Sequence, residues 1–301
     1  MARRRVRTSG SMSLLEVAQR RAVIVTGKGG VGKTTVSAAL GRAWAKRGKR
    51  VLIAEIVPHA DTPSQLATAL GVAAPTEEPA KIAPNLSLTL VTPPIGHLRF
   101  LQDALPLKVL ADAAMKSAGL RRFLTAAPGF SDMGVLYRVL DLMKRKRSDG
   151  ADEYEIVVVD SPATGHALAL AQIPEFLVRV IPAGPIARVA KEGIAVLTDP
   201  NVTGCVIVTL PETLPATEAL ELKKGLAEHK LMVSAIVVNR VPADPFSADE
   251  WRELETLPTN VLGVREARRV HRAREALALL PGAVRLPEVN ENPVDALEDF
   301  L

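Results

Sequence analysis

The chain has 301 residues, of which 48% are hydrophobic and 24% are charged, and it contains one cysteine, Cys205. A chain of this size can bury roughly 75% of its unfolded surface, which allows either one large α/β domain or two smaller ones. A single cysteine excludes a disulfide framework and a thiolate metal cage within one chain, and no apolar run approaches the ~20 residues of a membrane-spanning helix.

The first 20 residues begin with a basic segment and are expected to form a flexible tail. The net charge of the chain is +5. Without the four arginines of the first seven residues, the rest of the chain carries a net charge of 5 − 4 = +1. A nearly neutral remainder does not favour nucleic-acid binding. No apolar signal core follows the basic residues, so we expect a cytoplasmic protein. Met12 is an alternative translation start to Met1.

Short apolar runs alternate with helical patterns along the chain, which predicts an α/β fold with a mostly parallel sheet flanked by helices. Several runs are continuous in Val, Ile and Leu, as is typical of strands buried on both faces. The expected strands are Ala22–Thr26, Val51–Val57, Leu86–Val91, Glu155–Asp160, Gly204–Leu210, Val233–Asn239 and a short Val284–Leu286. The expected helices between them are Thr34–Arg47, about Thr217–Glu228 and Ala267–Leu279.

One part of the chain breaks this alternation. From about residue 97 to about residue 150 the pattern is helical only, and it continues from about 167 to 197. Proline and glycine mark the joints between these helices. We therefore expect residues 21–301 to form a single domain in which these segments make an inserted helical subdomain resting on the sheet.

The stretch TGKGGVGKTT at residues 26–35 follows an expected strand and opens an expected helix. It fits the phosphate-loop (P-loop) pattern G-x-x-x-x-G-K-[ST], in which glycines let backbone N–H groups surround phosphate oxygens at a helix N-terminus. Lys33 is expected to reach the β- and γ-phosphates of ATP, and the Thr34 hydroxyl is expected to bind Mg²⁺. The predicted nucleotide-binding residues of the loop are Gly27, Lys28, Gly29, Gly30, Val31, Gly32, Lys33, Thr34 and Thr35.

The loop contains a second lysine, Lys28, although Lys33 already serves the phosphates of its own chain. The pattern G-K-G-G-x-G-K-[ST] resembles the deviant P-loop of dimeric ATPases, among them the division-site, partition, arsenite-pump and tail-anchored-protein-targeting ATPases. The resemblance implies a P-loop NTPase of the SIMIBI class. It also implies that Lys28 crosses a dimer interface and acts on the partner's nucleotide like an arginine finger. The alternative is that Lys28 is a solvated lysine.

A second motif, YEIVVVDSPATGH at residues 154–166, distinguishes between these branches. An apolar strand that ends in Asp160 is expected to supply the carboxylate for Mg²⁺. The SPATGH that follows resembles switch II of the arsenite-pump and tail-anchored-targeting branch, D-T-A-P-T-G-H. The partition branch lacks this TGH ending, so a DNA-partition role is disfavoured.

Two later stretches extend the resemblance, which runs from about residue 22 to about residue 291. AIVVNR at residues 235–240 resembles the strand whose last Asn recognises adenine, which implies that role for Asn239. An Asn amide both donates and accepts hydrogen bonds, as the adenine edge requires; the alternative is an Asn that caps a loop. RLPEVNE at residues 285–291 resembles the loop that covers the base, which implies that Pro287 contacts the nucleotide.

Switch I departs from the pattern of this branch, in which an Asp after the second strand orients the attacking water. An ungapped alignment from Val51 puts Val57 at that position, whereas an alignment backwards from Gly71 puts Asp61 there. If Asp61 is the catalytic carboxylate, the chain is a competent hydrolase with a longer switch. If Val57 replaces it, hydrolysis is expected to be slow, because losing such a group typically lowers the rate 10²–10⁴-fold.

The cysteine count and the helical insert also bear on the function. Arsenite-binding members use several thiolates, and the single Cys205, expected to be buried on a strand, argues against an arsenite pump. The same count excludes the zinc clasp of the eukaryotic tail-anchored carriers. The insert contains Met115, Met133 and Met143, which could line an apolar client groove or pack between the insert's own helices.

The leading hypothesis is an ATPase that uses ATP and Mg²⁺ and works as a dimeric switch, coupling ATP-driven closure to the handling or transport of a client. Its partners would be a second copy or a related ATPase, together with a hydrophobic protein client or a membrane protein. The alternative is a weakly hydrolysing regulatory subunit that pairs with a related ATPase.

Overall fold

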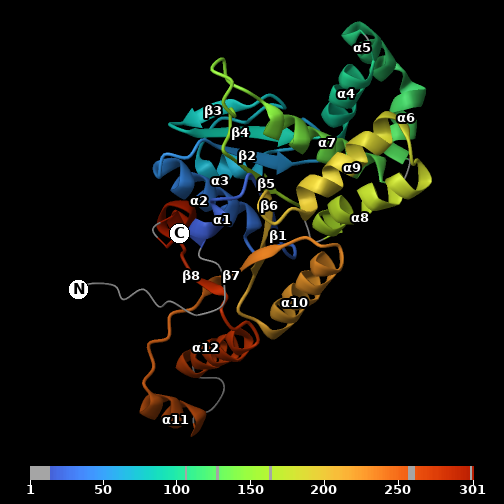
Figure 1. The fold of residues 1–301 in the computed structure, drawn as a ribbon. Helices are drawn as coiled ribbons and strands as arrows, with labels where there is room; N and C mark the ends of the chain where they lie inside the picture. Colours follow the sequence, from blue (N-terminus) through green and yellow to red (C-terminus); the bar gives the residue numbers. More distant parts are fainter. Residues whose placement is uncertain (1–13, 106, 127–128, 163–164, 257–261, 299) are drawn as a thin grey trace.

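The computed structural model describes residues 14–105, 107–126, 129–162, 165–256, 262–298 and 300–301 (Figure 1). Within these ranges one sheet has the strand order β3-β4-β2-β5-β1-β6-β7-β8. The strands are β1 (Ala22–Thr26), β2 (Val51–Ile56), β3 (Ala80–Ala83), β4 (Leu86–Val91), β5 (Ile156–Asp160), β6 (Thr203–Thr209), β7 (Val233–Val241) and β8 (Val284–Pro287).

Helices connect the strands and cover the sheet. They are α1 (Leu14–Val17), α2 (Lys33–Lys46), α3 (Gln65–Leu70), α4 (Pro93–Ala104), α5 (Lys108–Lys116), α6 (Ala118–Ala126), α7 (Phe130–Lys144), α8 (Gly165–Val180), α9 (Gly184–Thr198), α10 (Thr213–Glu228), α11 (Ala248–Thr256), α12 (Leu262–Ala278) and α13 (Pro293–Glu298). No helix in the described ranges has both the length and the apolar character needed to cross a bilayer.

All strand pairs are parallel except β3 with β4, so the predicted α/β fold with a mostly parallel sheet is confirmed. The antiparallel edge strand β3 was not predicted. Its residues are mostly exposed and show no apolar alternation, and it exists because the chain turns back at Pro84 and Asn85 to pair with β4. Asn85 takes the left-handed backbone conformation, with φ 59°, that such a tight turn requires.

The central strand β1 is buried on both faces. Ala22 and Ile24 pack into a core formed with α7, α8, α9 and α10, whereas Val23 and Val25 pack into a second core formed with α2, α3 and α13. Because successive side chains of a strand point to opposite faces, a continuous apolar run serves both cores at once. The sheet therefore lies between two helical layers.

Regular structure begins nearer the N-terminus than predicted. The flexible tail was expected to extend to residue 20, but α1 places Leu14 and Val17 in the core beside α2, with 5% and 0% of their surface exposed. Residues 1–13, which hold the basic cluster, lie outside the described residues.

Helices α4 to α9 lie together on one side of the molecule (green to yellow in Figure 1). Within this group Met133 and Met143 are buried in the core that α7 shares with the sheet, as is Leu136. These side chains do not line an open groove, so for Met133 and Met143 the packing alternative holds. Met115 is half-buried.

Helices α4 and α7 approach each other closely through two glycines. A Cβ atom at Gly96 would overlap the carbonyl group of Gly134, and a Cβ at Gly134 would lie 2.6 Å from the carbonyl oxygen of Pro93. The backbones can therefore touch only while both positions lack a side chain.

The substitution Gly96→Ala is expected to destabilise the protein by about 2 kcal/mol or more, because the added methyl group must push two backbones apart. Gly119→Ala in α6 is the matched control. Its Cβ would have no neighbour closer than 3.8 Å, so it should be neutral or stabilising by up to ~1 kcal/mol. Urea unfolding of both variants measures the difference, and equal stabilities would contradict the packing described.

Candidate nucleotide site

The P-loop, Asp160, Asn239 and Pro287 all lie at the edge of the sheet where the parallel strands have their carboxyl ends. β1 lies between β5 and β6, so the loop after β1 emerges between the ends of two neighbours. In open α/β sheets ligands bind outside this edge, where consecutive connections leave in opposite directions. The topology therefore brings together residues that are up to 260 positions apart.

The P-loop backbone has a shape that glycine alone permits at two positions. Gly27 has φ 143°, and a Cβ there would overlap the carbonyl oxygen of Val208 on β6. Gly32 has φ 90° and forms the N-cap of α2, with the Asn239 amide where a Cβ would be. The loop therefore lies directly against β6 and β7, with the α2 N-terminus open to an anion.

The other predicted residues of the loop differ in their exposure. Gly29 and Gly30 are exposed at its tip, whereas Val31 is buried and Thr35 is half-buried at the start of α2. Pro287 is half-buried and ends β8. These positions leave the backbone at the tip accessible to a ligand.

The two lysines of the loop point to different places. The Lys33 ammonium is buried and donates to the main-chain carbonyl oxygen of Lys28 at 3.0 Å, inside the loop. Burial lowers the pKa of Lys33, and the nearby Asp160 carboxylate opposes this shift. The Lys28 ammonium lies outside the loop, with 48% of its side chain exposed, and forms an ion pair with Glu218 on α10.

Asp160 joins α2 to the end of β5. Its two carboxylate oxygens accept hydrogen bonds from the hydroxyls of Thr34 and Ser37, each at 2.8 Å. Ser37 was missed by the sequence analysis, although it lies one helical turn after Thr34 and so shares its face. Burial raises the pKa of Asp160 to about 6; Ser37, Thr34 and Lys33 oppose this shift, whereas the Glu55 charge adds to it.

These groups fit a magnesium site. No cluster of three or more His, Cys, Asp or Glu side chains that could hold a metal occurs in the described parts of the chain. Mg²⁺ does not need one, since it is usually held by one or two protein ligands, waters and the phosphates of the substrate. Asp160 is 4% exposed and carries a charge that burial leaves poorly compensated. Asp160 and Thr34 are the residues that would hold the ion.

Asn239 is buried at the end of β7, and its amide nitrogen donates to the carbonyl oxygen of Val31 at 2.9 Å. It therefore ties the P-loop to β7, a contact that the sequence did not predict. The remaining amide hydrogen and the side-chain oxygen are not used by this bond. Adenine recognition by Asn239 stays a prediction.

The switch I alternatives occupy different environments. Val57 directly follows β2 with 5% of its surface exposed, whereas Asp61 lies in the exposed turn between β2 and α3. A third residue, Glu55, was missed. It is a buried carboxylate on β2, opposite Asp160 in the strand register. Its oxygens accept from the Ser64 hydroxyl and, at 2.9 Å, from the backbone N–H of Gln65.

Glu55 therefore caps the N-terminus of α3 and is engaged in holding the end of switch I. A carboxylate inside the apolar run VLIAEIV was the available signal for it, because such a residue is rarely buried without partners. In switch II, residues 163–164 lie outside the described residues, and Gly165 opens α8.

Comparison with known proteins agrees with this geometry. The family model for anion-transporting ATPases matches residues 20–183, which span the P-loop and Asp160. The chain belongs to this family. The resemblance to the arsenite-pump and tail-anchored-targeting branch is thereby confirmed.

Three relatives illustrate the range of this family. ATPase BagA of Mycobacterium tuberculosis is 30% identical over 227 residues, which cover 73% of this chain and 65% of BagA. The arsenical pump-driving ATPase of Escherichia coli is 25% identical over 272 residues, which cover 79% of this chain and 44% of that ATPase. ATPase ASNA1 homolog 1 of Paramecium tetraurelia is 31% identical over 162 residues, which cover 52% of this chain and 44% of that homolog. The chain thus matches between 44% and 65% of the length of these relatives.

The substitution Asp160→Asn is expected to change how stability depends on pH. The pKa of Asp160 is raised from 3.8 to about 6 by folding, so the folded protein holds this proton more tightly than the unfolded chain. As pH rises between these values, wild type loses stability relative to the variant by about 1.4 kcal/mol per pH unit. Above about pH 6 the difference should be constant.

Urea unfolding of both proteins from pH 4 to pH 8, without nucleotide or Mg²⁺, measures this difference. Asp249→Asn on α11, where the carboxylate is 87% exposed, is the control and should give a difference that is nearly flat. A flat difference for Asp160→Asn as well would contradict the described burial of its charge.

Proposed function

We propose that the chain binds Mg·ATP, closes as a dimer over it and hydrolyses it, acting as a switch for the handling of a client. The observation that carries this proposal is that the two lysines of the P-loop point to different places. Lys33 lies within the loop and serves its own site, whereas Lys28 points outward from the same loop. Among the described residues the Lys28 ammonium pairs with Glu218 at the surface, where it can turn toward the nucleotide of a second subunit.

Within one chain, the loop N–H groups and Lys33 hold the phosphates, and Asp160 and Thr34 hold Mg²⁺. When bound, the ion neutralises charge on the β- and γ-phosphates. A cation beside Asp160 favours the charged form of its carboxylate. Ser37 keeps the second carboxylate oxygen fixed.

Lys28 acts across the interface in this proposal. Its partner Glu218 and the lysine itself are partly exposed, and such surface pairs contribute only about 0–1 kcal/mol. The phosphate oxygens of a nucleotide bound to a second subunit can therefore displace Glu218 from Lys28 at a small cost in free energy. A positive charge placed where negative charge develops stabilises the transition state of phosphoryl transfer.

Asp61 is the proposed switch I carboxylate that orients water. Val57 is apolar and buried, and Glu55 is already engaged in capping α3. Asp61 is exposed in the loop between Val57 and α3 and has no hydrogen bond or ion pair to the rest of the described chain. It is thus the free carboxylate of switch I.

The helical subdomain supports the client part of the proposal. Large apolar side chains are exposed on α5 and α8, among them Val109 at 75% and Val180 at 58%. We propose that the client is a hydrophobic protein segment or a membrane protein, and that the switch works in the cytoplasm. A regulatory subunit with slow hydrolysis, paired with a related ATPase, is the second candidate; Val57 at the end of β2 favours it.

Steady-state ATP hydrolysis, measured against protein concentration, tests the proposal. Specific activity should rise with concentration for wild type. The rise should disappear in Lys28→Ala, and activity should fall about 10²–10⁴-fold in Asp61→Ala. Lys81→Ala on the edge strand β3 removes the same charge far from the loop along the sheet order and should leave activity unchanged.

Each other outcome has a defined meaning. Background activity at all concentrations, with Mg·ATP still bound, would reject the hydrolase for the lone chain and favour the regulatory subunit. Specific activity that is independent of concentration and insensitive to Lys28→Ala would reject the proposed role of the dimer.

A further inference from the structure

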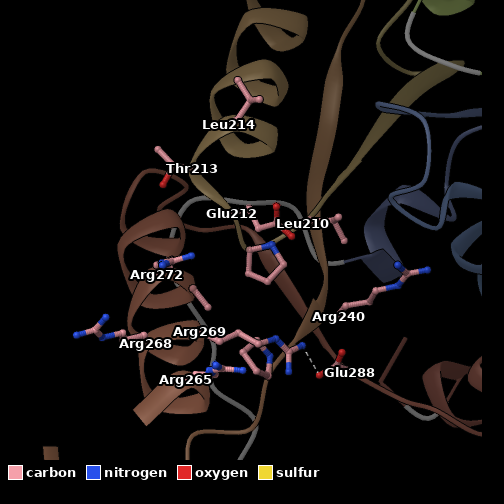
Figure 2. A pocket seen from close by; sticks show the side chains of 13 residues that line it. Leu210, Glu212, Thr213, Leu214, Arg240, Arg265, Arg268, Arg269, Arg272 and Glu288 are labelled. Carbon is pink, nitrogen blue, oxygen red and sulfur yellow. Dashed lines mark hydrogen bonds and ion pairs between the residues drawn. The ribbon is translucent and has the colours of Figure 1, made fainter. Parts of the chain in front are cut away.

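The nucleotide site extends along the sheet edge on both sides of the P-loop. Toward β8, a pocket of about 770 Å³ is lined by the β6–α10 loop, the end of β7 and α12 (Figure 2). Its lining residues Arg240 and Glu288 directly follow Asn239 and Pro287, so this pocket is part of the nucleotide site. Toward β2 lies the switch I loop, residues 57–64, which follows β2 and leads into α3.

A turn places Asp61 inside the switch I loop. The backbone N–H of Thr62 donates to the carbonyl oxygen of His59 at 3.1 Å, which makes Asp61 the third residue of a tight turn. At the start of the loop, the N–H of Val57 donates to the carbonyl oxygen of Val91 on β4 at 3.0 Å. The position of this turn over the sheet therefore depends on how the other end of the loop is held.

Glu55 on β2 holds that other end. Its carboxylate accepts hydrogen bonds from the Ser64 hydroxyl and from the backbone N–H groups of Gln65 and Leu66, at 2.9 and 3.3 Å. The Ser64 hydroxyl oxygen in turn accepts from the N–H of Ala67 at 2.9 Å. The first three N–H groups of α3 are thereby satisfied. A residue that precedes the loop thus binds the residues that follow it, which closes the loop at its base.

These hydrogen bonds are shielded from water. Glu55 is 5% exposed and Ser64 is 8% exposed, and hydrogen bonds to a charged acceptor are roughly twice as strong as neutral ones. Without the acceptor at Glu55, the buried hydroxyl and the helix N–H groups lose their partner, so the end of the loop must move to reach water. A glutamine at this position keeps one acceptor oxygen, and its amide nitrogen can donate to the Ser64 hydroxyl oxygen.

We propose that Glu55 is a positioning residue for ATP hydrolysis: by fixing the end of switch I to β2, it sets where the Asp61 carboxylate lies relative to the nucleotide. This inference rests on the proposed role of Asp61 in orienting water. Misplacement of a reacting group by about 1 Å can lower a rate about 10²-fold. Glu55 acts here through its acceptor oxygens and not through its charge beside Asp160.

Single-turnover hydrolysis, at a protein concentration where wild-type activity has reached its plateau, tests this role. Glu55→Ala should lower the rate about 10²-fold, whereas Glu55→Gln should stay within about tenfold of wild type because it keeps an acceptor. In the Asp61→Ala background, Glu55→Ala should change the rate less than about twofold, since the group that it positions is absent. Glu250→Ala is the control: this carboxylate accepts from the Ser247 N–H at the start of α11, at 2.7 Å, and its loss should leave hydrolysis unchanged.

Hydrogen exchange without nucleotide measures the loop directly. The N–H groups of Gln65 and Leu66 should exchange at least about tenfold faster in Glu55→Ala than in wild type, because their acceptor is lost. In Glu55→Gln they should exchange nearly as slowly as in wild type. The N–H of Ile95 at the start of α4, which has its own cap, should be unaffected in both variants, which separates a local change from a general loss of stability.

The inference is overturned if Glu55→Ala hydrolyses ATP at the wild-type rate, or if exchange at Gln65 and Leu66 is unchanged. It is also overturned if Glu55→Gln is as slow as Glu55→Ala, or if Glu55→Ala slows the Asp61→Ala protein further, because Glu55 would then act by its charge and not through Asp61. Absence of hydrolysis in wild type rejects the proposed function itself, and this inference with it. The wild-type rate therefore distinguishes the two failures.

Discussion

The hydrogen bonds from Thr34 and Ser37 to Asp160 are the contacts on which the rest of the site depends. They fix the first turn of α2 to the end of β5, and α2 in turn fixes where the P-loop opens. The same carboxylate is buried among apolar strands, so its charge is poorly compensated until a cation arrives. In the proposed function this carboxylate is the group that would hold Mg²⁺.

This contact also connects the two switch regions. Glu55 faces Asp160 across the β2–β5 pair and caps α3, the helix that ends switch I. Both carboxylates are buried, and the Glu55 charge raises the pKa of Asp160. A cation at Asp160 would therefore also reduce the repulsion on Glu55.

The sequence predicted the parallel strands and the P-loop because each depends on local patterns, such as apolar runs and glycines at fixed spacing. It failed where a residue's role depends on a distant neighbour. The Asn239–Val31 bond and the Lys28–Glu218 pair join residues about 200 positions apart, and no local pattern reports them. Strand β3 was missed because its exposed residues have no periodicity and only pairing with β4 makes it a strand.

The central claim is that a complete catalytic site takes Lys33 from one chain and Lys28 from another. Mixing Lys28→Ala with Lys33→Ala tests it most directly, because each variant alone lacks one part of every site. The account predicts that the mixture recovers hydrolysis, up to about a quarter of the wild-type rate, since half of the dimers are mixed and each has one complete site. A mixture no more active than its separate components would contradict a shared site.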